Sequence, residues 1–140
     1  MNIPISEFVG GFRFLSNFYP VSIVLEGNVY LSVEHAFQAA KTADPLEQQK
    51  IREMPTPGKA KRAGRQVTLR PNWERIKLRI MEALVRQKFG HPELGKKLLA
   101  TGNKELVEGN NHGDVFWGKY NGEGENWLGR ILMKVRQELQ

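Results

Sequence analysis

Residues 30–41 decide the fold, and they read YLSVEHAFQAAK. Ser32 is an expected helix N-cap, because its hydroxyl can accept a backbone amide of the first turn. After this cap the apolar residues return at helical spacing, which predicts a helix with one buried face. Glu34, Gln38 and Lys41 follow the spacing i, i+4, i+7 and form a polar stripe along the edge of that face. The ordinary alternative is a half-exposed helix with a surface Glu–Lys pair, which contributes little to stability.

The composition, with 40% hydrophobic and 26% charged residues, is ordinary for a soluble globular protein. The chain has 140 residues, and we expect a single domain over residues 1–140. It contains no cysteine, which excludes disulfides, thiolate metal ligands and cysteine nucleophiles. The formal net charge of +6 favours an anionic partner, either a phosphorylated small molecule or a nucleic acid.

Several kinds of site and location are not expected. The three histidines, His35, His91 and His112, do not lie at metal-ligand spacing, so no metal site is expected. No glycine pattern of a dinucleotide or phosphate-binding loop opens a helix, and no cofactor is expected. No apolar run is long enough to span a membrane, and the N-terminus lacks the features of a signal peptide. We therefore expect a cytoplasmic protein with no membrane partner.

The segments before the central helix predict a small antiparallel sheet. Alternation in residues 12–14, which read FRF, predicts a short strand. Residues 21–25 and 29–31 are two β-rich runs, and Gly27-Asn28 between them is a hairpin turn signal. With the helices that follow, this gives an α+β fold class: a single compact, mostly helical domain with a small antiparallel sheet.

Proline and cap residues predict the later helices. Asp44 and Pro45, with Glu47 completing a capping box, start a helix that must stop before Pro55. The same signal recurs at Thr56-Pro57 and starts a short basic helix. Further helices are expected at 71–90, 92–99 and 126–139, and a strand at 106–107.

The segment from Glu108 to Asn126 differs from the rest of the chain. It is rich in Gly and Asn, yet it carries Asp114, Phe116 and Trp117. Large aromatic side chains in a polar loop indicate either a ligand-binding wall or a loop folded back on the core. Asn126, at its end, is expected to cap the last helix.

An ordered series of short motifs resembles the YbiA-like, or NADAR, family. The motifs are LSNF at 15–18, SVEHAFQAAK at 32–41, GR at 64–65, LR at 69–70, NWE at 72–74, the segment 114–118, and GEGENWLG at 122–129. The resemblance covers nearly the whole chain and implies a compact, mostly helical α+β domain. It also implies a hydrolase of the N-glycosidase class, which cleaves a bond between C1′ and nitrogen in a ribose that carries phosphate.

Two substrate classes are implied by the resemblance. One is the phosphorylated ribosylamino-pyrimidines of the early riboflavin pathway, and the other is ADP-ribose attached to guanine bases in nucleic acid. The expected partner is therefore a small phosphoribosyl or ADP-ribosyl substrate, or ADP-ribosylated nucleic acid. The net positive charge mildly favours the nucleic-acid-linked substrate.

The family's important acid matches Glu34. Its other important positions match Asn17, Lys41, Trp73, Asp114, Trp117 and Asn126. Breaking an N-glycosidic bond builds positive charge on C1′, and a nearby carboxylate stabilises that charge and can activate water. Glu34 is the first catalytic candidate, and Asp114 is the second, as partner acid or acceptor for a ribose hydroxyl. Lys41 is the third, to stabilise charge, hold a phosphate or form an imine with the opened ribose.

The remaining candidates are expected to bind substrate. They are Trp73 and Trp117 for the base, Asn17 and Asn126 for the ribose, and Arg13 and Arg65 for phosphate. Each has an ordinary structural alternative: core packing for the tryptophans, a helix cap for Asn126, and a solvated surface position for the arginines.

Two other functions compete with an N-glycosidase. A binding module would recognise ADP-ribose without cleaving it and would not need Glu34 and Lys41. A nucleic-acid-binding protein would use the basic run from Lys59 to Arg65 and would bind undamaged DNA or RNA with strong salt dependence.

Overall fold

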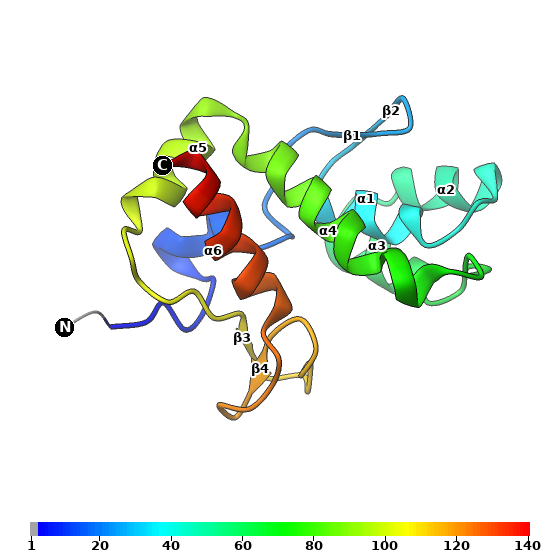
Figure 1. Cartoon of the computed structure of the whole chain (residues 1–140). Helices are drawn as coiled ribbons and strands as arrows, with labels where there is room; N and C mark the ends of the chain where they lie inside the picture. The colour runs from blue at the N-terminus through cyan, green and yellow to red at the C-terminus, as the bar shows by residue number, and fades with distance from the viewer. Residues whose placement is uncertain (1–2) are drawn as a thin grey trace. The chain divides into compact units, whose positions relative to one another are not determined.

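The computed structural model describes residues 3–140, and Figure 1 shows the arrangement of the elements within each part of the chain. The chain divides into two compact units. Unit 2 is Asn17–Lys88, and unit 1 consists of Phe89–Gln140 with the described part of Met1–Ser16. Among the described residues there are six α-helices, one 3₁₀-helix and four short strands. The predicted fold class is confirmed: the chain is mostly helical and α+β, with a small antiparallel sheet.

Unit 2 begins with the predicted hairpin. Strands β1 (Ile23–Leu25) and β2 (Asn28–Tyr30) pair antiparallel, with Ile23 opposite Tyr30. Glu26 and Gly27 both have positive φ, 51° and 82°, which is the backbone of a type I′ turn. The hairpin is confirmed, and its turn lies one residue earlier than the Gly27-Asn28 signal indicated.

The central helix is α1 (Val33–Ala40), and it begins as predicted. The Ser32 hydroxyl accepts the backbone amide of His35 at 3.1 Å. All eight residues of α1 are buried, because the helix packs against α2 (Pro45–Arg52) and α3 (Pro57–Gly64), as Figure 1 shows. Glu34 and Gln38 of the polar stripe therefore lie inside unit 2. The alternative of a surface Glu–Lys pair is wrong for Glu34, which is buried.

The proline-based start signals are confirmed. Asp44 accepts the Leu46 amide at 2.9 Å and begins α2, and Thr56 begins α3 in the same way. The predicted capping box is not formed. Glu47 instead accepts hydrogen bonds from the Thr42 hydroxyl and the Thr68 amide, and so ties α2 to the segment after α3.

Helix α4 (Trp73–Phe89) is the longest helix, and its residues up to Lys88 belong to unit 2. The Gln87 side chain accepts the Val24 amide at 2.6 Å and donates to the Val24 carbonyl at 2.9 Å. This pair of hydrogen bonds fixes the β1–β2 hairpin to α4.

Unit 1 is built from η1 (Gly10–Leu15), α5 (Pro92–Ala100) and α6 (Trp127–Leu139). The predicted strand at residues 12–14 is wrong, since these residues lie in the 3₁₀-helix η1. Phe14 and its neighbour Leu15 are both buried, whereas a strand would send adjacent side chains to opposite faces. Phe12 is turned outward and is 39% exposed.

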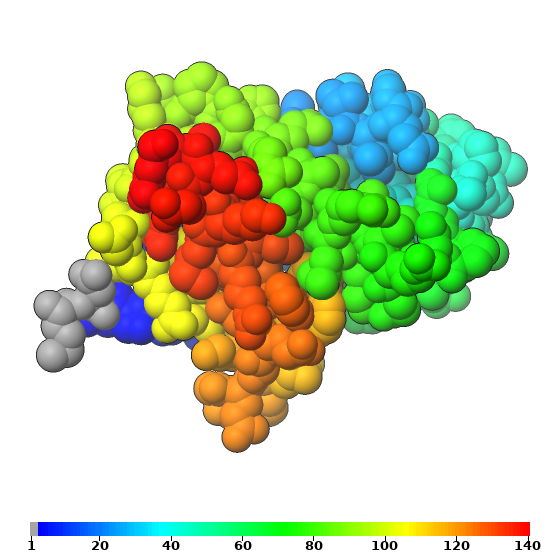
Figure 2. Space-filling view, viewed as in Figure 1, coloured from blue at the N-terminus to red at the C-terminus, as the bar shows by residue number. Residues whose placement is uncertain are grey.

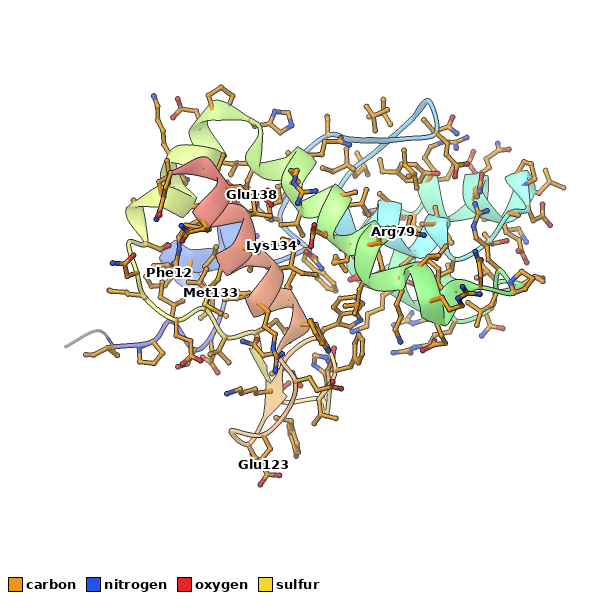
Figure 3. All side chains as sticks on the ribbon, viewed as in Figure 1. Phe12, Arg79, Glu123, Met133, Lys134 and Glu138 are labelled. Carbon is orange, nitrogen blue, oxygen red and sulfur yellow. The ribbon has the colours of Figure 1, made fainter. Side chains whose placement is uncertain are left out.

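The Gly- and Asn-rich segment also belongs to unit 1. Strands β3 (Gly109–Asn110) and β4 (Lys119–Tyr120) pair in parallel, which the sequence pattern did not indicate. Leu106 pairs with Ile5 as a single bridge, so the expected strand at 106–107 is reduced to one pair. The loop after β4 projects from the rest of unit 1 in Figure 2, and Figure 3 labels Glu123 at its tip. None of the helices in residues 3–140 is long and apolar enough to cross a membrane.

Candidate active site

The carboxylate of Glu34 is a buried ionisable group of unit 2. It lies in the first turn of α1, and only 8% of the residue is exposed. Burial raises the pKa of the Glu34 carboxyl above its ordinary value, and the hydrogen bond from Gln38 and the positive charges of Lys61 and Lys41 oppose that shift. A buried acid whose pKa is raised and on whose charge two amines act is a candidate for accepting and returning a proton.

Gln38 holds the Glu34 carboxylate from one helical turn away. Its Nε2 donates to Oε2 of Glu34 at 2.6 Å. The other amide atom, Oε1, is buried and has no hydrogen-bond partner among the described residues. It points at Gly64 of α3, where a Cβ atom would overlap it. Glycine at position 64 therefore leaves the space that the Gln38 amide needs in order to face Glu34.

Lys41 follows the last residue of α1 and is half-buried. Burial lowers the pKa of the Lys41 amine, while the carboxylate of Glu34 opposes that shift. The positive charges of Arg65, Lys61 and Lys77 lower the pKa of Lys41 further. The arrangement is a cluster of cations around one buried carboxylate, which suits a substrate that carries phosphate.

Arg70 fixes the end of α1 that carries Lys41. Its Nε donates to the Ala40 carbonyl at 2.9 Å, and its backbone amide donates to the Lys41 carbonyl at 2.8 Å. These bonds satisfy two of the carbonyls that a helix leaves open at its C-terminus. The guanidinium also reaches Glu26 of the hairpin turn at 3.4 Å.

His35 is accounted for as a structural residue. Its Nδ1 lies 2.7 Å from the Ser32 hydroxyl, and its Nε2 lies 2.9 Å from the Met54 carbonyl. A tautomer with the proton on Nε2 satisfies both contacts and joins the start of α1 to the segment between α2 and α3. Across residues 3–140, no group of three or more His, Cys, Asp or Glu side chains is placed to hold a metal ion.

Asn17 and Trp73 lie in unit 2 with Glu34. The Asn17 carbonyl accepts the Glu34 amide at 3.1 Å, so Asn17 helps to fix the first turn of α1. Its side-chain Oδ1 is buried and has no hydrogen-bond partner among the described residues. Trp73 is 5% exposed, and its ring lies 5.1 Å from the ring of Phe37 at 53°. This packing matches the core alternative stated for Trp73, whereas the buried Oδ1 acceptor of Asn17 stays unsatisfied within the described residues.

The remaining candidate of unit 2 is Arg65. It follows the last residue of α3 and is exposed, like Lys59 and Arg62 of the same basic run. Lys61 is half-buried and is the member of the run that acts on the charge of Glu34. In unit 2, therefore, the charges of Glu34 and Arg65 both act on the pKa of Lys41.

Asp114 and Trp117 lie in the Gly- and Asn-rich loop of unit 1. Oδ1 of Asp114 accepts the backbone amides of Phe116 and Trp117, at 3.0 and 2.9 Å, which fixes the turn that presents the tryptophan. Trp117 is half-buried, and its ring meets that of Phe116 edge-on at 4.9 Å. Asn110 holds the same loop by accepting the Asp114 amide and donating to the Asp114 carbonyl.

Asn126 stands at the predicted N-cap position of α6, and its carbonyl accepts the Arg130 amide at 2.9 Å, but its side chain does not cap the helix. Asn126 has a left-handed backbone, with φ of 55°, and makes no side-chain cap bond to α6. Its amide instead donates to the Leu106 carbonyl and accepts the Glu108 amide, both at 2.9 Å. Asn126 is buried and joins the start of α6 to the segment before β3. Arg13 of η1 is exposed, and it lies in unit 1 with Asp114, Trp117 and Asn126.

The sequence did not indicate the roles of Gln38, Gly64 and Arg70 around Glu34 and Lys41. Gln38 was recognised as part of the polar stripe, and its i+4 spacing from Glu34 was the available signal for the hydrogen bond. Gly64 and Arg70 lie in motifs that carried the family resemblance, but nothing in their local pattern indicated which side chains they serve. Their roles depend on packing between helices.

Comparison with known proteins identifies the family. The model of the NADAR domain matches residues 8–140. An N-glycosidase YbiA from Shigella flexneri is 41% identical over 128 residues, covering 89% of this chain and 79% of the relative. The NMR structure of the Escherichia coli protein YbiA superimposes with a TM-score of 0.85 at 37% identity, covering 98% of this chain and 83% of that one.

A riboflavin biosynthesis protein from Vibrio vulnificus is 44% identical over 131 residues, and this chain spans 35% of its length. An N-glycosidase from Nostoc punctiforme is 39% identical over 132 residues. These names confirm the prediction of an enzyme, a hydrolase of the N-glycosidase class. The predicted likeness to YbiA is confirmed in sequence and in fold, and the chain therefore belongs to the NADAR family.

Proposed function

We propose that this chain hydrolyses the C1′–N bond of a phosphorylated ribose, with Glu34 as the catalytic carboxylate. The observation that carries the proposal is the buried Glu34 carboxylate with Lys41 and Lys61 close enough to act on its charge. Burying a carboxylate opposes folding. A buried carboxylate that is also held by a directed hydrogen bond therefore favours a functional role for Glu34 over a purely structural one.

In the proposed reaction the C1′–N bond breaks and its electron pair goes to the departing nitrogen, which finally receives the proton that Glu34 takes from water. Positive charge then develops on C1′, where the Glu34 carboxylate stabilises it. Glu34 accepts a proton from the attacking water as the new C1′–O bond forms. Its raised pKa favours this proton transfer, and the Gln38 hydrogen bond keeps the carboxylate oriented.

We propose Lys41 as the second catalytic group. Because burial lowers its pKa, a larger fraction of the amine is neutral and nucleophilic than for an exposed lysine. A neutral amine can attack the aldehyde at C1′ of an opened ribose and form an imine with loss of water. Treatment with borohydride would trap that imine as a stable adduct on Lys41, and mass spectrometry would locate it. Lys41→Arg keeps the charge and cannot form the adduct.

The remaining site residues are proposed for binding. Asp114 is proposed as partner acid or ribose-hydroxyl acceptor, and its second carboxylate oxygen is the atom for that role, since Oδ1 holds the loop. The other proposed contacts are Asn17 for ribose, Trp73 and Trp117 for the base, and Arg13 and Arg65 for phosphate. For Asn126, whose amide is already used by the backbone, we propose action through the loop that it holds. One family model runs through both units, which supports treating residues 1–140 as one domain.

Two substrates fit this chemistry. The relatives named riboflavin biosynthesis proteins support a phosphorylated ribosylamino-pyrimidine. The net charge of +6 supports ADP-ribose attached to guanine in nucleic acid, since the flanking phosphates would add favourable contacts.

The deciding experiment compares the two substrates directly. The purified chain is incubated with a ribosylamino-pyrimidine phosphate and, separately, with single-stranded DNA that carries ADP-ribosylated guanine, and mass spectrometry follows both products. Glu34→Gln is the inactive variant, and Glu93→Gln, an exposed acid of α5, is the matched control. Release of the pyrimidine or of ADP-ribose, lost only in Glu34→Gln, supports the proposal. Binding of ADP-ribose without cleavage of either substrate would overturn it in favour of a binding module.

A further inference from the structure

Unit 1 contains an open pocket of about 330 Å³ that the proposed reaction does not use. Its walls come from η1, from α5 and from the residues that flank them. The residues that matter to its chemistry are Ile5, Phe12, Phe14, Lys97, Thr101 and Lys104, and all of them belong to unit 1. A volume of this size lies at the lower end of the range for pockets that hold small organic ligands, roughly 300–1,000 Å³.

The pocket presents an exposed aromatic ring above an apolar floor. Phe14 and Ile5 are buried, whereas Phe12 is 39% exposed. Figure 3 labels Phe12 on η1, where the 3₁₀ turn directs it away from the core that Phe14 fills. A single exposed phenylalanine is ordinary by itself. Here the ring lines a cavity, so a flat ligand can stack on it without any rearrangement of the core.

The same pocket is positively charged. Lys97 Nζ lies 5.8 Å from the centre of the Phe14 ring, and Lys104 lines the pocket with it. No acidic residue lines the pocket, and neither lysine forms an ion pair within residues 3–140. Behind the wall, Arg136 donates from Nη1 to the Thr101 hydroxyl at 2.8 Å, and this arginine is 6% exposed. Its buried charge adds to the positive potential without being available to a ligand.

We propose that this pocket binds a nucleotide, with the base on Phe12 and a phosphate between Lys97 and Lys104. A stacking surface beside unpaired lysines is the combination that binds unpaired bases in single-stranded nucleic acids. An aromatic ligand without an anion would leave the lysines unused, and an anion without a ring would leave Phe12 unused. The nucleotide is either free or part of a single strand, since the two share this chemistry. The inference does not rest on Glu34 or on the proposed reaction.

The test uses two probes, AMP and a short oligothymidylate, in the Glu34→Gln background so that neither probe is hydrolysed. Affinity is measured by titration, and backbone amide shifts locate the binding. We expect Phe12→Ala to weaken binding about tenfold and Phe12→Trp to retain it. We expect Lys97→Ala and Lys104→Ala each to weaken binding and, for the single strand, to reduce the slope of log affinity against log salt by about 0.7. Lys96→Ala is the matched control, because Lys96 is an exposed neighbour on α5 outside the pocket lining.

The outcomes of these titrations decide whether the pocket binds a nucleotide. Binding of AMP with shifts in η1 and α5 identifies a free-nucleotide site, and binding of the oligothymidylate alone identifies a single-strand site. Shifts confined to other parts of the chain would overturn the inference. It would also be overturned if neither probe bound, or if Phe12→Ala and Lys97→Ala bound as tightly as Lys96→Ala.

Discussion

At the scale of a single residue, Glu34 opposes folding at neutral pH. Its pKa is raised mainly by burial, so the folded chain holds a proton at pH values where the unfolded chain has already released it. Stability from this group is therefore highest at low pH and falls as the pH rises through the raised pKa of the folded chain. With Glu34 as the proposed catalytic carboxylate, activity and stability make opposite demands on this position, as is common for catalytic residues.

We expect Glu34→Gln to lower turnover by about a hundredfold or more, because the charge that stabilises C1′ is lost while the shape is kept. We also expect the variant to be the more stable protein at pH 7. Near pH 4, where the wild-type carboxyl is protonated, the two proteins should unfold at similar temperatures, and the difference should grow towards pH 7. Thermal unfolding across this range and a turnover assay check both parts, with Glu93→Gln as control. Near-full turnover in Glu34→Gln would contradict the assigned role.

Gly64 offers a test of how the Glu34 carboxylate is oriented. We expect Gly64→Ala to displace the Gln38 amide, since the new Cβ would overlap Oε1 of Gln38. Losing the bond from Gln38 removes an interaction that lowers the pKa of Glu34, so the acidic limb of the pH–rate profile should move to higher pH. Gly58→Ala is the matched control, because position 58 lies in the same helix with open space around its Cβ. Equal pH profiles for the two variants would show that Gln38 has no positioning role.

At the scale of elements, α1 is held at both ends by residues from elsewhere in unit 2. Ser32 and the Asn17 carbonyl satisfy amides of its first turn, and Arg70 satisfies carbonyls at its end. The helix has only eight residues, too few for stable helix formation in isolation. Its geometry, and with it the spacing of Glu34 and Lys41, therefore depends on these contacts and on the packing of α2 and α3.

We expect Arg70→Met to reduce turnover and to destabilise the fold by about 1–3 kcal/mol, because it removes a charged hydrogen bond to a carbonyl at the end of α1. The backbone bond from Arg70 to the Lys41 carbonyl stays in the variant. The effect on turnover should still be larger than stability explains, since the lost side-chain bond holds the end of α1 next to Lys41. Denaturant unfolding and assays well below the transition separate the two effects. Arg75→Met, at an exposed position of α4, is the control, and equal behaviour of both variants would contradict this account.

The difference between contacts within one helical turn and contacts between distant segments explains which features the sequence could predict. Caps such as Ser32, Asp44 and Thr56 act within one turn, so their residue types were sufficient evidence. The FRF segment was misassigned because alternation over three residues does not distinguish a strand from a 3₁₀ turn, and the burial of adjacent Phe14 and Leu15 comes from tertiary packing.

The candidate site shows the same limit. Glu34 and Lys41 could be identified from their motif, whereas Gly64 and Arg70 act on α1 through contacts between segments distant in sequence. Asparagine favours the N-cap position, and Asn126 does stand there, but the backbone of Leu106 and Glu108 binds its side-chain amide in place of the first turn of α6. For this side chain a long-range partner overrides the local propensity.

At the scale of the whole molecule, buried basic groups shape the response to pH. Arg136 is 6% exposed, and although burial lowers its pKa, its guanidinium stays protonated at neutral pH and donates to Thr101. Lys88 of α4 is 1% exposed and lies 5.6 Å from the centre of the Tyr19 ring. Burial lowers the pKa of Lys88 to about 7, so this lysine, unlike the arginine, loses its charge within the physiological range.

Between pH 7 and 10.5 the unfolded chain binds a proton at Lys88 that the folded chain has lost, so this group makes stability rise with pH across that interval. Below pH 7 the amine is protonated in both states, and the cost of burying its charge counts against the folded state. We expect Lys88→Met to raise the unfolding temperature by at least about 3 °C at pH 6 and by progressively less as the pH increases towards 10. Lys96→Met, at an exposed position of α5, should change little at any pH. Parallel stability curves for wild type and Lys88→Met would mean that the protonation of Lys88 does not change on folding, and the pH dependence of this fold would then have to be assigned to its buried acid, Glu34.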